Sequence, residues 1–373
     1  MVIGVTVVGL LAEGEDPWAL PAARPVRPPW VTGGVRRLFR TLAAAAVAGE
    51  RAEIRGPVPV EQLAEICRPA GVRVELPAVP RDPRPDDVVL VLAGQPDPRF
   101  YGRCALSPAR TVILVLGPPG FYGWPFTAGW ERRPPLEVDP EEVGRPEHVA
   151  AMAALGFTLW TNSDRLAALG GAGGVPMTNV GRGTPEPPPE LPDKTVDVAV
   201  VTANRWWPRA RLALEGLRPG VTVDRVPEVG HAELTARVGA ARVLVHVPAI
   251  EGHSAINEEA RARGTVPVGL RSNRFGEGLR EEEGGVGVDG LDEVAPAVHA
   301  LLDDPGRRAR LADAGRRKAL ADLDWEPYVE RVRTALGALP DRPGRAALAE
   351  MGRALAADRR LLVELAESQE HAA

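Results

Sequence analysis

Short runs of β-branched and aliphatic residues alternate with longer, alanine-rich stretches along the chain. Most of the short runs are continuously apolar, which is the pattern of strands buried on both faces in a parallel sheet covered by helices. The alternation predicts an α/β fold built from doubly wound parallel sheets. The expected strands are Val2–Val8, Ala52–Arg55, Val72–Leu76, Val88–Leu92, Val112–Leu116, Thr158–Thr161, Val196–Val201, Val221–Val226, Val243–Val247 and Val266–Leu270.

The longer stretches between these runs predict helices, because their apolar residues recur at helical spacing. The last of them forms one amphipathic segment at the end of the chain. The expected helices are Gly34–Ala48, Val60–Arg68, Pro146–Leu155, Pro208–Leu217, Ala232–Val238, Ser254–Arg263, Leu291–Leu302, Gly306–Ala321, Glu326–Leu336 and Gly344–Glu370.

A proline-rich stretch divides the chain into two comparable halves. It reads GRGTPEPPPELPDK over residues 181–194, and five prolines combined with charge favour a semi-rigid linker. We expect a first domain over 1–182, a linker over 183–194, a second domain over 195–338, and a C-terminal helix over 340–373 that packs back on the first domain. Two α/β halves joined in this way place a cleft between them, a common site for ligands.

Composition and charge narrow the classes of function. The 373 residues are 45% hydrophobic, enough for two cores, and carry a formal net charge of −5 from 45 basic and 50 acidic residues. Without a basic excess we expect no nucleic-acid partner. No apolar run reaches the ~20 residues of a membrane helix, and the N-terminus lacks a basic leader segment. We therefore expect a cytoplasmic protein with no integral membrane segment.

Two residue counts add detail. Lys194 and Lys318 are the only lysines, and the abundance of Arg, Ala, Gly and Pro is typical of a GC-rich genome, which points to an actinobacterial source. Cys67 and Cys104 are too few for a disulfide framework or a cysteine-rich zinc site. Both cysteines are expected to be small buried residues.

The segment that carries most chemistry is VLVHVPAIEGHSAINEEARARGTVPVGL, residues 243–270. It predicts a strand, then a turn, then a helix, and then a second strand. The helix begins at the N-cap Ser254 and ends at Gly264. A strand, a glycine turn and a helix N-terminus together make an anion-binding site. Glu251 precedes the helix and Glu259 lies inside it, where a carboxylate could accept hydrogen bonds from a ribose diol. Ordinary solvation of a helical first turn by Glu258 and Glu259 is the alternative that local physics leaves open.

This segment resembles the signature of retaining GT-B glycosyltransferases, in particular the large family 4. Glu251-Gly252, then Glu259-Ala260 with seven residues between the two glutamates, and the run from Gly264 to Val268 match that pattern. Downstream, residues 284–289 and 301–332 are similar to the family's last strand and helices. Upstream, Thr32-Gly33-Gly34-Val35 is similar to its N-terminal glycine loop. The resemblance implies two Rossmann-like domains facing a cleft, an N-terminal domain that binds the acceptor and a C-terminal domain that binds the nucleotide-sugar donor.

The resemblance also implies roles for individual residues. Glu259 would hold the ribose of a nucleotide-sugar donor, and Glu251 would contact the donor sugar. The backbone amides of Gly252, His253 and Ser254 would contact the sugar or its phosphates, and the Gly33 and Gly34 loop would line the donor site. The family also has an arginine and a lysine that neutralise the diphosphate. Arg205 corresponds to the arginine, and Arg209 is the candidate for the lysine, one residue earlier than usual and with arginine in place of lysine.

The first domain lacks a histidine that many relatives carry after the strand equivalent to Val112–Leu116. In its place stands GPPGFYGWPF, residues 117–126, whose Tyr122, Trp124 and Phe126 could stack on an acceptor. A tight turn with core aromatics is the alternative. By resemblance, transfer retains the anomeric configuration, with the departing phosphate helping to take the acceptor proton. Fixed positive charge from Arg205, Arg209 and the helix N-terminus would stabilise that leaving group.

Other classes of protein fit less well. A serine hydrolase would place its nucleophile at Ser254, but Ile256 replaces the second glycine of G-x-S-x-G. Asp322-Leu323-Asp324 has the letters of a metal-binding D-x-D but the position of a helix boundary, with Asp324 as an N-cap. An oxidoreductase would need G-x-G-x-x-G after the first strand, and the glycines there do not have this spacing. His231, His246 and His299 are interpreted as structural. A non-catalytic GT-B protein that binds a nucleotide or scaffolds a partner stays open.

The sequence therefore predicts a glycosyltransferase that uses a nucleoside-diphosphate sugar and a small-molecule acceptor, with no cofactor and no metal. Secondary metabolism is the context that the composition favours. The sequence leaves open the donor's base and sugar, the acceptor and the oligomeric state.

Overall fold

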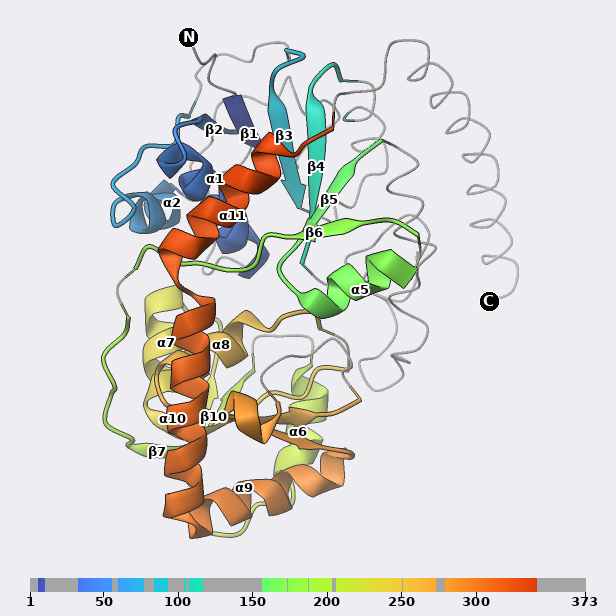
Figure 1. The fold of residues 1–373 in the computed structure, drawn as a ribbon. Helices are drawn as coiled ribbons and strands as arrows, with labels where there is room; N and C mark the ends of the chain where they lie inside the picture. Colours follow the sequence, from blue (N-terminus) through green and yellow to red (C-terminus); the bar gives the residue numbers. More distant parts are fainter. Residues whose placement is uncertain are drawn as a thin grey trace, which may run out of the picture.

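Two parallel sheets, one in each half of the chain, form the framework of the computed structural model (Figure 1). The structure describes residues 6–10, 33–55, 60–76, 84–92, 104, 107–116, 156–172, 174–186, 188–202, 206–249, 251–272 and 279–340. Two expected helices lie outside these residues, Pro146–Leu155 and Gly344–Glu370. The expected C-terminal helix over 340–373 therefore also lies outside them, apart from Pro340.

The first sheet has the order β2-β1-β3-β4-β5-β6, and every pairing is parallel. The chain moves from β1 to β2 on one side and then to β3 on the other, so the strand order reverses between β1 and β3. Its strands are β1 (Thr6–Leu10), β2 (Arg51–Arg55), β3 (Val88–Leu92), β4 (Arg110–Val115), β5 (Thr158–Thr161) and β6 (Met177–Asn179).

The second sheet has the order β11-β10-β9-β7-β8 and is also parallel throughout. Here the order reverses between β7 and β9. Its strands are β7 (Val196–Val201), β8 (Val223–Val226), β9 (Ala241–Val245), β10 (Val266–Leu270) and β11 (Val286–Val288).

Helices cover both faces of each sheet, as doubly wound sheets require. The described helices of the first half are α1 (Gly33–Val47), α2 (Val60–Cys67) and α5 (Asp164–Ala172). Those that follow are α6 (Trp207–Leu214), α7 (His231–Gly239), α8 (Ala255–Ala262), α9 (Val294–Asp303), α10 (Pro305–Asp322) and α11 (Trp325–Gly337), with 3₁₀ turns η3 (Glu281–Glu283) and η4 (Leu291–Glu293).

One expected strand is wrong. In Val72–Leu76, a single residue, Glu75, forms an isolated parallel bridge with Glu53 of β2. The segment lies beyond the edge strand β2, where Leu76 is 37% exposed and has no sheet face to pack on. Two backbone hydrogen bonds, from Ile54 N to Glu75 O and from Glu75 N to Ala52 O, are all that its pairing provides. The three-residue strand β6 was not expected, because it is too short to show a pattern.

The described part of the linker runs along the second half. Lys194 Nζ donates to the carbonyls of Gly239 and Arg263, at 2.6 and 2.8 Å, and to Thr265 Oγ1 at 2.8 Å. Arg316 on α10 donates to the carbonyl of Pro189 at 2.9 Å. These bonds attach the proline-rich stretch to the second half, while the domain boundaries at residues 182 and 194 stay a prediction.

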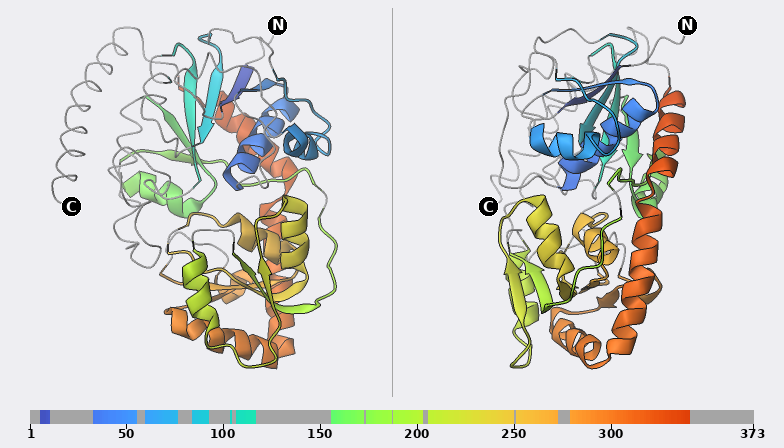
Figure 2. Two further views of the ribbon diagram at one scale, coloured as in Figure 1. Left: turned by 180° about the vertical axis from the view of Figure 1, so that it is seen from behind. Right: turned by 90° about the vertical axis from the view of Figure 1, so that its left-hand side faces the viewer.

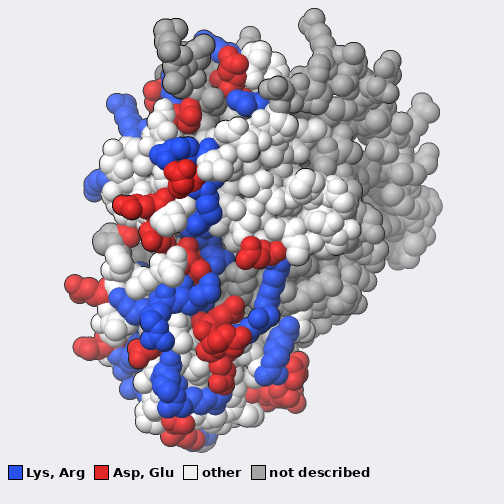
Figure 3. Space-filling view, viewed as in Figure 1, with Lys and Arg blue, Asp and Glu red and all other residues white. Residues whose placement is uncertain are grey.

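Charged side chains of both signs share the outer surface. On the face shown in Figure 3, Lys and Arg are interleaved with Asp and Glu over α10 and α11, so this face carries no field of a single sign. Among the described helices, none is both long and apolar enough to cross a bilayer.

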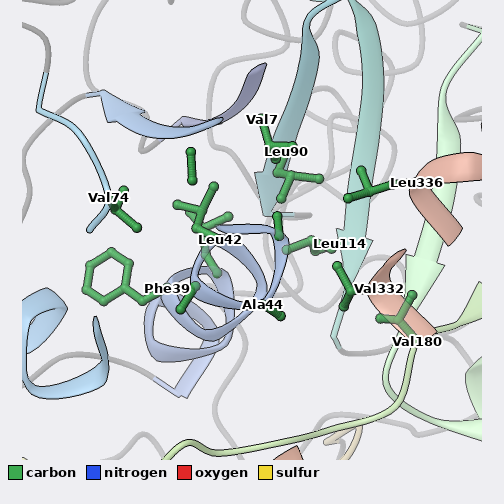
Figure 4. Packing of buried hydrophobic residues seen from close by; sticks show 14 of the residues in the cluster. Val7, Phe39, Leu42, Ala44, Val74, Leu90, Leu114, Val180, Val332 and Leu336 are labelled. Carbon is green, nitrogen blue, oxygen red and sulfur yellow. The ribbon is translucent and has the colours of Figure 1, made fainter. Parts of the chain in front are cut away.

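The core of the first half is completed by a helix that follows the second half in sequence. On one face of the sheet, Val7, Leu90 and Leu114 meet Phe39 and Leu42 of α1 (Figure 4). Helix α11 adds to the same cluster with Tyr328, Val329, Val332, Ala335 and Leu336. Figure 2 shows α10 and α11 running along one side of both halves. Helix α11 falls within the range 195–338 expected for the second domain, yet it packs against the first half.

Candidate functional site

The strand order of the second sheet creates a crevice at one defined place. Where the order of a parallel sheet reverses, the loops at the carboxyl ends of the two central strands leave in opposite directions and open a crevice between them. In this sheet that place lies between β7 and β9. The loop after β7 leads into α6, and the loop after β9 leads into α8. Two helix N-termini, each with outward-pointing amides, therefore face the crevice.

The start of α8 has the predicted form. Ser254 is the N-cap, and its Oγ accepts from the backbone N–H of Asn257 at 3.3 Å. The helix ends before Gly264, whose φ of +71° is the left-handed conformation that favours glycine. Gly252, His253 and Ser254 are buried, and Glu251 is partly exposed. The start of α8 thus buries three consecutive residues and leaves the Glu251 side chain 25% exposed.

His246 organises this loop. It follows β9 directly, and its backbone N–H donates to Val268 O of β10 at 3.0 Å. Its Nε2 lies 3.3 Å from Glu251 Oε2, and its Nδ1 lies 3.3 Å from Ser254 Oγ. The ring is 6% exposed. His246 therefore lies between the predicted sugar-contacting carboxylate and the N-cap of α8.

Arg209 reaches the same crevice from the other side. It lies in the first turn of α6, after the Trp206 N-cap and Pro208. Its Nε donates to Val247 O at 3.1 Å, which ties α6 to the loop that carries Glu251. Burial lowers the pKa of Arg209, but a guanidinium stays charged at neutral pH. The structure thus brings Arg209 and the Glu251 loop together across the crevice between β7 and β9.

The remaining predicted residues lie at the start of α1 or outside the described chain. Gly33 and Gly34 open α1 after β1, at the carboxyl edge of the first sheet. Arg205, Tyr122, Trp124 and Phe126 lie outside the described residues.

Glu259 lies in an enclosed polar corner rather than free in solvent. Its Oε2 pairs with Arg263 at 2.6 Å, and its Oε1 lies 3.6 Å from His231 Nε2 and 3.9 Å from Arg40 of α1. Burial lowers the pKa of His231 to about 4, so this imidazole is neutral at pH 7 and meets Glu259 as a dipole. These three neighbours leave lone pairs on the Glu259 carboxylate that can accept further hydrogen bonds.

The neighbouring residue, Glu258, is the buried one, and sequence reasoning did not single it out. Its side chain is 3% exposed. Its Oε1 lies 2.9 Å from Arg182 Nε and 3.2 Å from His253 Nε2, and its Oε2 lies 3.8 Å from Arg37 Nη2 of α1. Arg182 Nη1 lies 2.6 Å from His253 Nδ1. One carboxylate thus joins the candidate loop, the chain that leaves the first half, and α1.

Three neighbouring groups outweigh burial at the Glu258 carboxyl. Burial raises the pKa of Glu258, while His253, Arg182 and Arg37 lower it further, so the pKa lies well below its usual range. Burial lowers the pKa of Arg37 to about 10, against the attraction of Glu258. Both groups are therefore charged at neutral pH.

A second carboxylate extends this arrangement along α1. Glu186 pairs with Arg36 at 2.6 Å and with Arg40 at 2.8 Å, and it accepts from Thr184 Oγ1 at 2.5 Å. Arg182 also donates to Asn162 O at 3.2 Å and to Asp322 of α10 at 3.0 Å. We call the following residues the interdomain ion cluster: Arg36, Arg37, Arg40, Arg182, Glu186, His253 and Glu258.

The interdomain ion cluster connects the two halves directly behind the candidate loop. Buried charges are costly unless paired, and an apolar replacement is often equally stable. Such a cluster therefore contributes a defined geometry between elements more than net stability. A signal for it exists in the sequence: arginines at positions 36, 37 and 40 sit in a helix that is otherwise almost wholly apolar and so must be buried on most sides.

No metal centre emerges from the described part of the chain. Within it, no group of three or more His, Cys, Asp or Glu side chains is arranged to hold an ion. Asp322 ends α10 and pairs with Lys318 and Arg182, and Asp324 is the N-cap position of α11. The expected helix boundary at Asp322-Leu323-Asp324 is confirmed. Cys67 and Cys104 are both buried, as expected.

Solved structures of similar fold include several glycosyltransferases. HepE of Anabaena in complex with UDP-glucose has a TM-score of 0.59 at 12% sequence identity, covering 90% of this chain and 100% of that chain. Sucrose-phosphate synthase from Thermosynechococcus elongatus has a TM-score of 0.56 at 14% identity, covering 90% and 98%. A glycosyltransferase from Rickettsia africae has a TM-score of 0.55 at 11% identity, covering 91% and 100%.

No protein-family model and no curated protein matches the sequence. At these identities the similarity is one of fold. It extends over about nine-tenths of the chain and agrees with the two doubly wound parallel sheets described above. The chain has the GT-B fold.

Proposed function

We propose that this protein is a glycosyltransferase that uses a nucleotide-sugar donor. The observation that carries the proposal is the meeting of Arg209 with the Glu251 loop and the N-terminus of α8 at the crevice between β7 and β9. A cation, a row of amides and an accessible carboxylate suit a sugar diphosphate. The similar HepE structure holds UDP-glucose, so a donor of this class fits the same fold.

Within this proposal, each group has a chemical task. The bond between the sugar's anomeric carbon and the diphosphate oxygen breaks, and a bond to the acceptor oxygen forms. Arg209 and the amides of the α8 N-terminus stabilise the charge on the leaving diphosphate. Glu251, beside His246, orients the donor sugar, and Glu259 accepts hydrogen bonds from the ribose.

We also propose the finer features that the family 4 resemblance implies. The acceptor attacks from the face that the diphosphate leaves, its proton passes to the departing phosphate oxygen, and the anomeric configuration is retained. Arginine and amide groups take the leaving-group charge in place of a metal. The acceptor is a small molecule of secondary metabolism, and the reaction takes place in the cytoplasm.

The serine-hydrolase alternative is not proposed, because of the environment of Ser254. This side chain is 1% exposed, and its hydroxyl caps α8 by accepting from Asn257. A catalytic serine must be accessible to its substrate, and its hydroxyl must not be engaged in capping a helix.

Turnover separates an enzyme from a non-catalytic relative that binds nucleotides. The purified protein is incubated with UDP-, GDP-, ADP- and dTDP-sugars, and release of free nucleoside diphosphate is followed. We expect slow release from at least one donor without an acceptor, because water takes the acceptor's place. Binding of a donor without any release of diphosphate would contradict the proposal and support the scaffold alternative.

A further inference from the structure

A cavity of about 670 Å³ lies beside the crevice, between the two halves. Leu270 and Arg271 contribute from the carboxyl end of β10, and Val286 and Gly287 from β11. Arg165, in the first turn of α5, lines the cavity from the first half. Figure 1 shows α5 on the side of the first half that faces the second. Because β10 is the neighbour of β9, the cavity is one strand away from the Glu251 loop.

Of two paired glycines at the ends of these strands, Gly287 lines the cavity. Gly269 of β10 lies opposite Gly287 of β11. A Cβ on Gly269 would lie 2.6 Å from His246 O and 3.1 Å from a methyl of Leu279, and one on Gly287 would lie 2.8 Å from Arg271 Cγ. The missing side chains let Leu279 approach the strand ends closely. The volume of the cavity lies within the roughly 300–1,000 Å³ of ligand sites.

The charges of the lining are of both signs, with arginine in excess. Arg271 pairs with Asp289 at 2.9 Å, and Arg307 pairs with Glu281 at 2.5 Å. Within the described chain, Arg280 and Glu282 form no ion pair, although both line the cavity. The cavity therefore offers one guanidinium and one carboxylate that are available to a ligand.

Arg280 and Glu282 favour different chemical groups on a ligand. The planar guanidinium of Arg280 binds a carboxylate or a phosphate through two parallel hydrogen bonds. The carboxylate of Glu282 only accepts hydrogen bonds, so it suits hydroxyl groups and repels anions. A molecule that satisfies both carries several hydroxyls and a single anionic group.

We propose that this cavity binds the acceptor, and that the acceptor is a polyhydroxylated molecule bearing a carboxylate or a phosphate. The inference rests on the proposed function, since the place of the donor in the neighbouring crevice leaves this cavity for the second substrate. It names Arg280 as a specificity-determining residue.

Calorimetric titration of the full chain tests the inference with three probes. Glucuronate and glucose 6-phosphate carry the two kinds of anion, and glucose is their neutral counterpart. We expect one or both anions to bind at least about tenfold more tightly than glucose. Arg280→Ala should remove that difference. Arg317→Ala is the matched control, because Arg317 is an exposed arginine of α10 outside the lining, and it should keep the difference.

The titrations are repeated with UDP, GDP, ADP and dTDP added together at saturating concentration. Persistence of anion binding supports an acceptor site, whereas its loss would assign the cavity to the donor's diphosphate and overturn the inference. Equal affinities for the three probes, or no effect of Arg280→Ala, would also overturn it. Failure of all four nucleotides to bind would instead count against the proposed function, and the titrations without nucleotide would still decide whether the cavity binds an anionic sugar.

Discussion

Glu258 and Glu259 are consecutive residues that differ in burial, with side chains 3% and 16% exposed. Glu258 is enclosed by Arg182, Arg37 and His253, while Glu259 pairs with Arg263 one turn further along the same helix. Loss of one partner of a buried ion pair leaves uncompensated charge, whereas an i,i+4 pair on a helix contributes little. The two positions should therefore respond very differently to the same substitution.

The substitution Glu258→Gln should lower the free energy of unfolding by about 3 kcal/mol at pH 7, because Arg182, Arg37 and His253 lose their common partner. Glu259→Gln is the matched control and should cost about 0.5 kcal/mol. Urea unfolding of the two variants beside the wild type measures both values. Similar losses at the two positions would show that Glu258 is not the centre of the interdomain ion cluster.

Glu186 makes stability depend on pH in the acid range. Burial raises its pKa, but Arg40, Arg36 and Thr184 outweigh this and lower the pKa from 4.5 to about 2. A folded pKa below the unfolded value means that the stabilisation is complete above about pH 4.5 and is lost as the pH falls toward 2.

Glu186→Gln should accordingly reduce the free energy of unfolding by about 2 kcal/mol at pH 7, a value discounted for partial exposure. The gap between variant and wild type should shrink between pH 4.5 and pH 3. Urea unfolding at pH 7, 5 and 3 measures it. Glu190→Gln, at an exposed linker position, is the control and should show no gap. A gap that is constant down to pH 3 would contradict the assignment.

Sequence reasoning located the residues whose roles follow from local order along the chain. Ser254 as an N-cap, Gly264 as the helix end and Glu251 in the turn between them are set by neighbours a few positions away. The pair of Glu258 and Arg182 could not be found in this way, because the two residues lie 76 positions apart in the sequence. Only the packing of α8 against the segment that leaves the first half brings them together.

At the scale of elements, continuous apolar runs predicted the strands well wherever two neighbours flank the strand. The segment Val72–Leu76, which was wrongly expected as a strand, has a different pattern, because apolar and charged residues alternate in it. Only Glu75 of this segment pairs with the edge strand β2, through an isolated bridge with Glu53. The backbone at the junction of η3 with β11 was also not predictable from local pattern, because it depends on contact with α10. A Cβ on Gly284 would lie 2.1 Å from Gly315 Cα, and the φ of Gly284 is +81°.

Gly284→Ala should lower the free energy of unfolding by about 3 kcal/mol, through backbone strain and a clash with backbone that cannot turn aside. Gly220→Ala is the matched control, since Gly220 has a φ of +90° but no atom near its Cβ position. It should cost about 1 kcal/mol from strain alone. Thermal unfolding of both variants tests the comparison, and equal costs would mean that α10 does not press on Gly284.

At the scale of the whole molecule, α11 makes the first half depend on chain that follows the second. Val332 is fully buried among first-half residues, although it is encoded after the entire second sheet. The two α/β halves and the cleft were predictable from sequence, whereas this return of the chain was expected only beyond residue 338. Helical periodicity shows that α11 is amphipathic but not which half covers its apolar face.

Val332→Ala should therefore lower the free energy of unfolding by about 2 kcal/mol, from lost burial and the cavity left behind. Arg333→Ala, at the exposed neighbouring position, should change it by less than about 0.5 kcal/mol. Urea unfolding measures the difference. A negligible effect of Val332→Ala would place α11 away from the first-half core.

The central claim is that the crevice between β7 and β9 binds the diphosphate of a nucleotide sugar and promotes its departure. It is tested most directly by the rate of nucleoside diphosphate release, compared between the wild type, Arg209→Ala and the control Arg211→Ala. Arg211 lies two residues further along α6 and is exposed. The account predicts that Arg209→Ala lowers kcat/KM for the donor by about a hundredfold while Arg211→Ala leaves it unchanged. Equal rates for wild type and Arg209→Ala would contradict it.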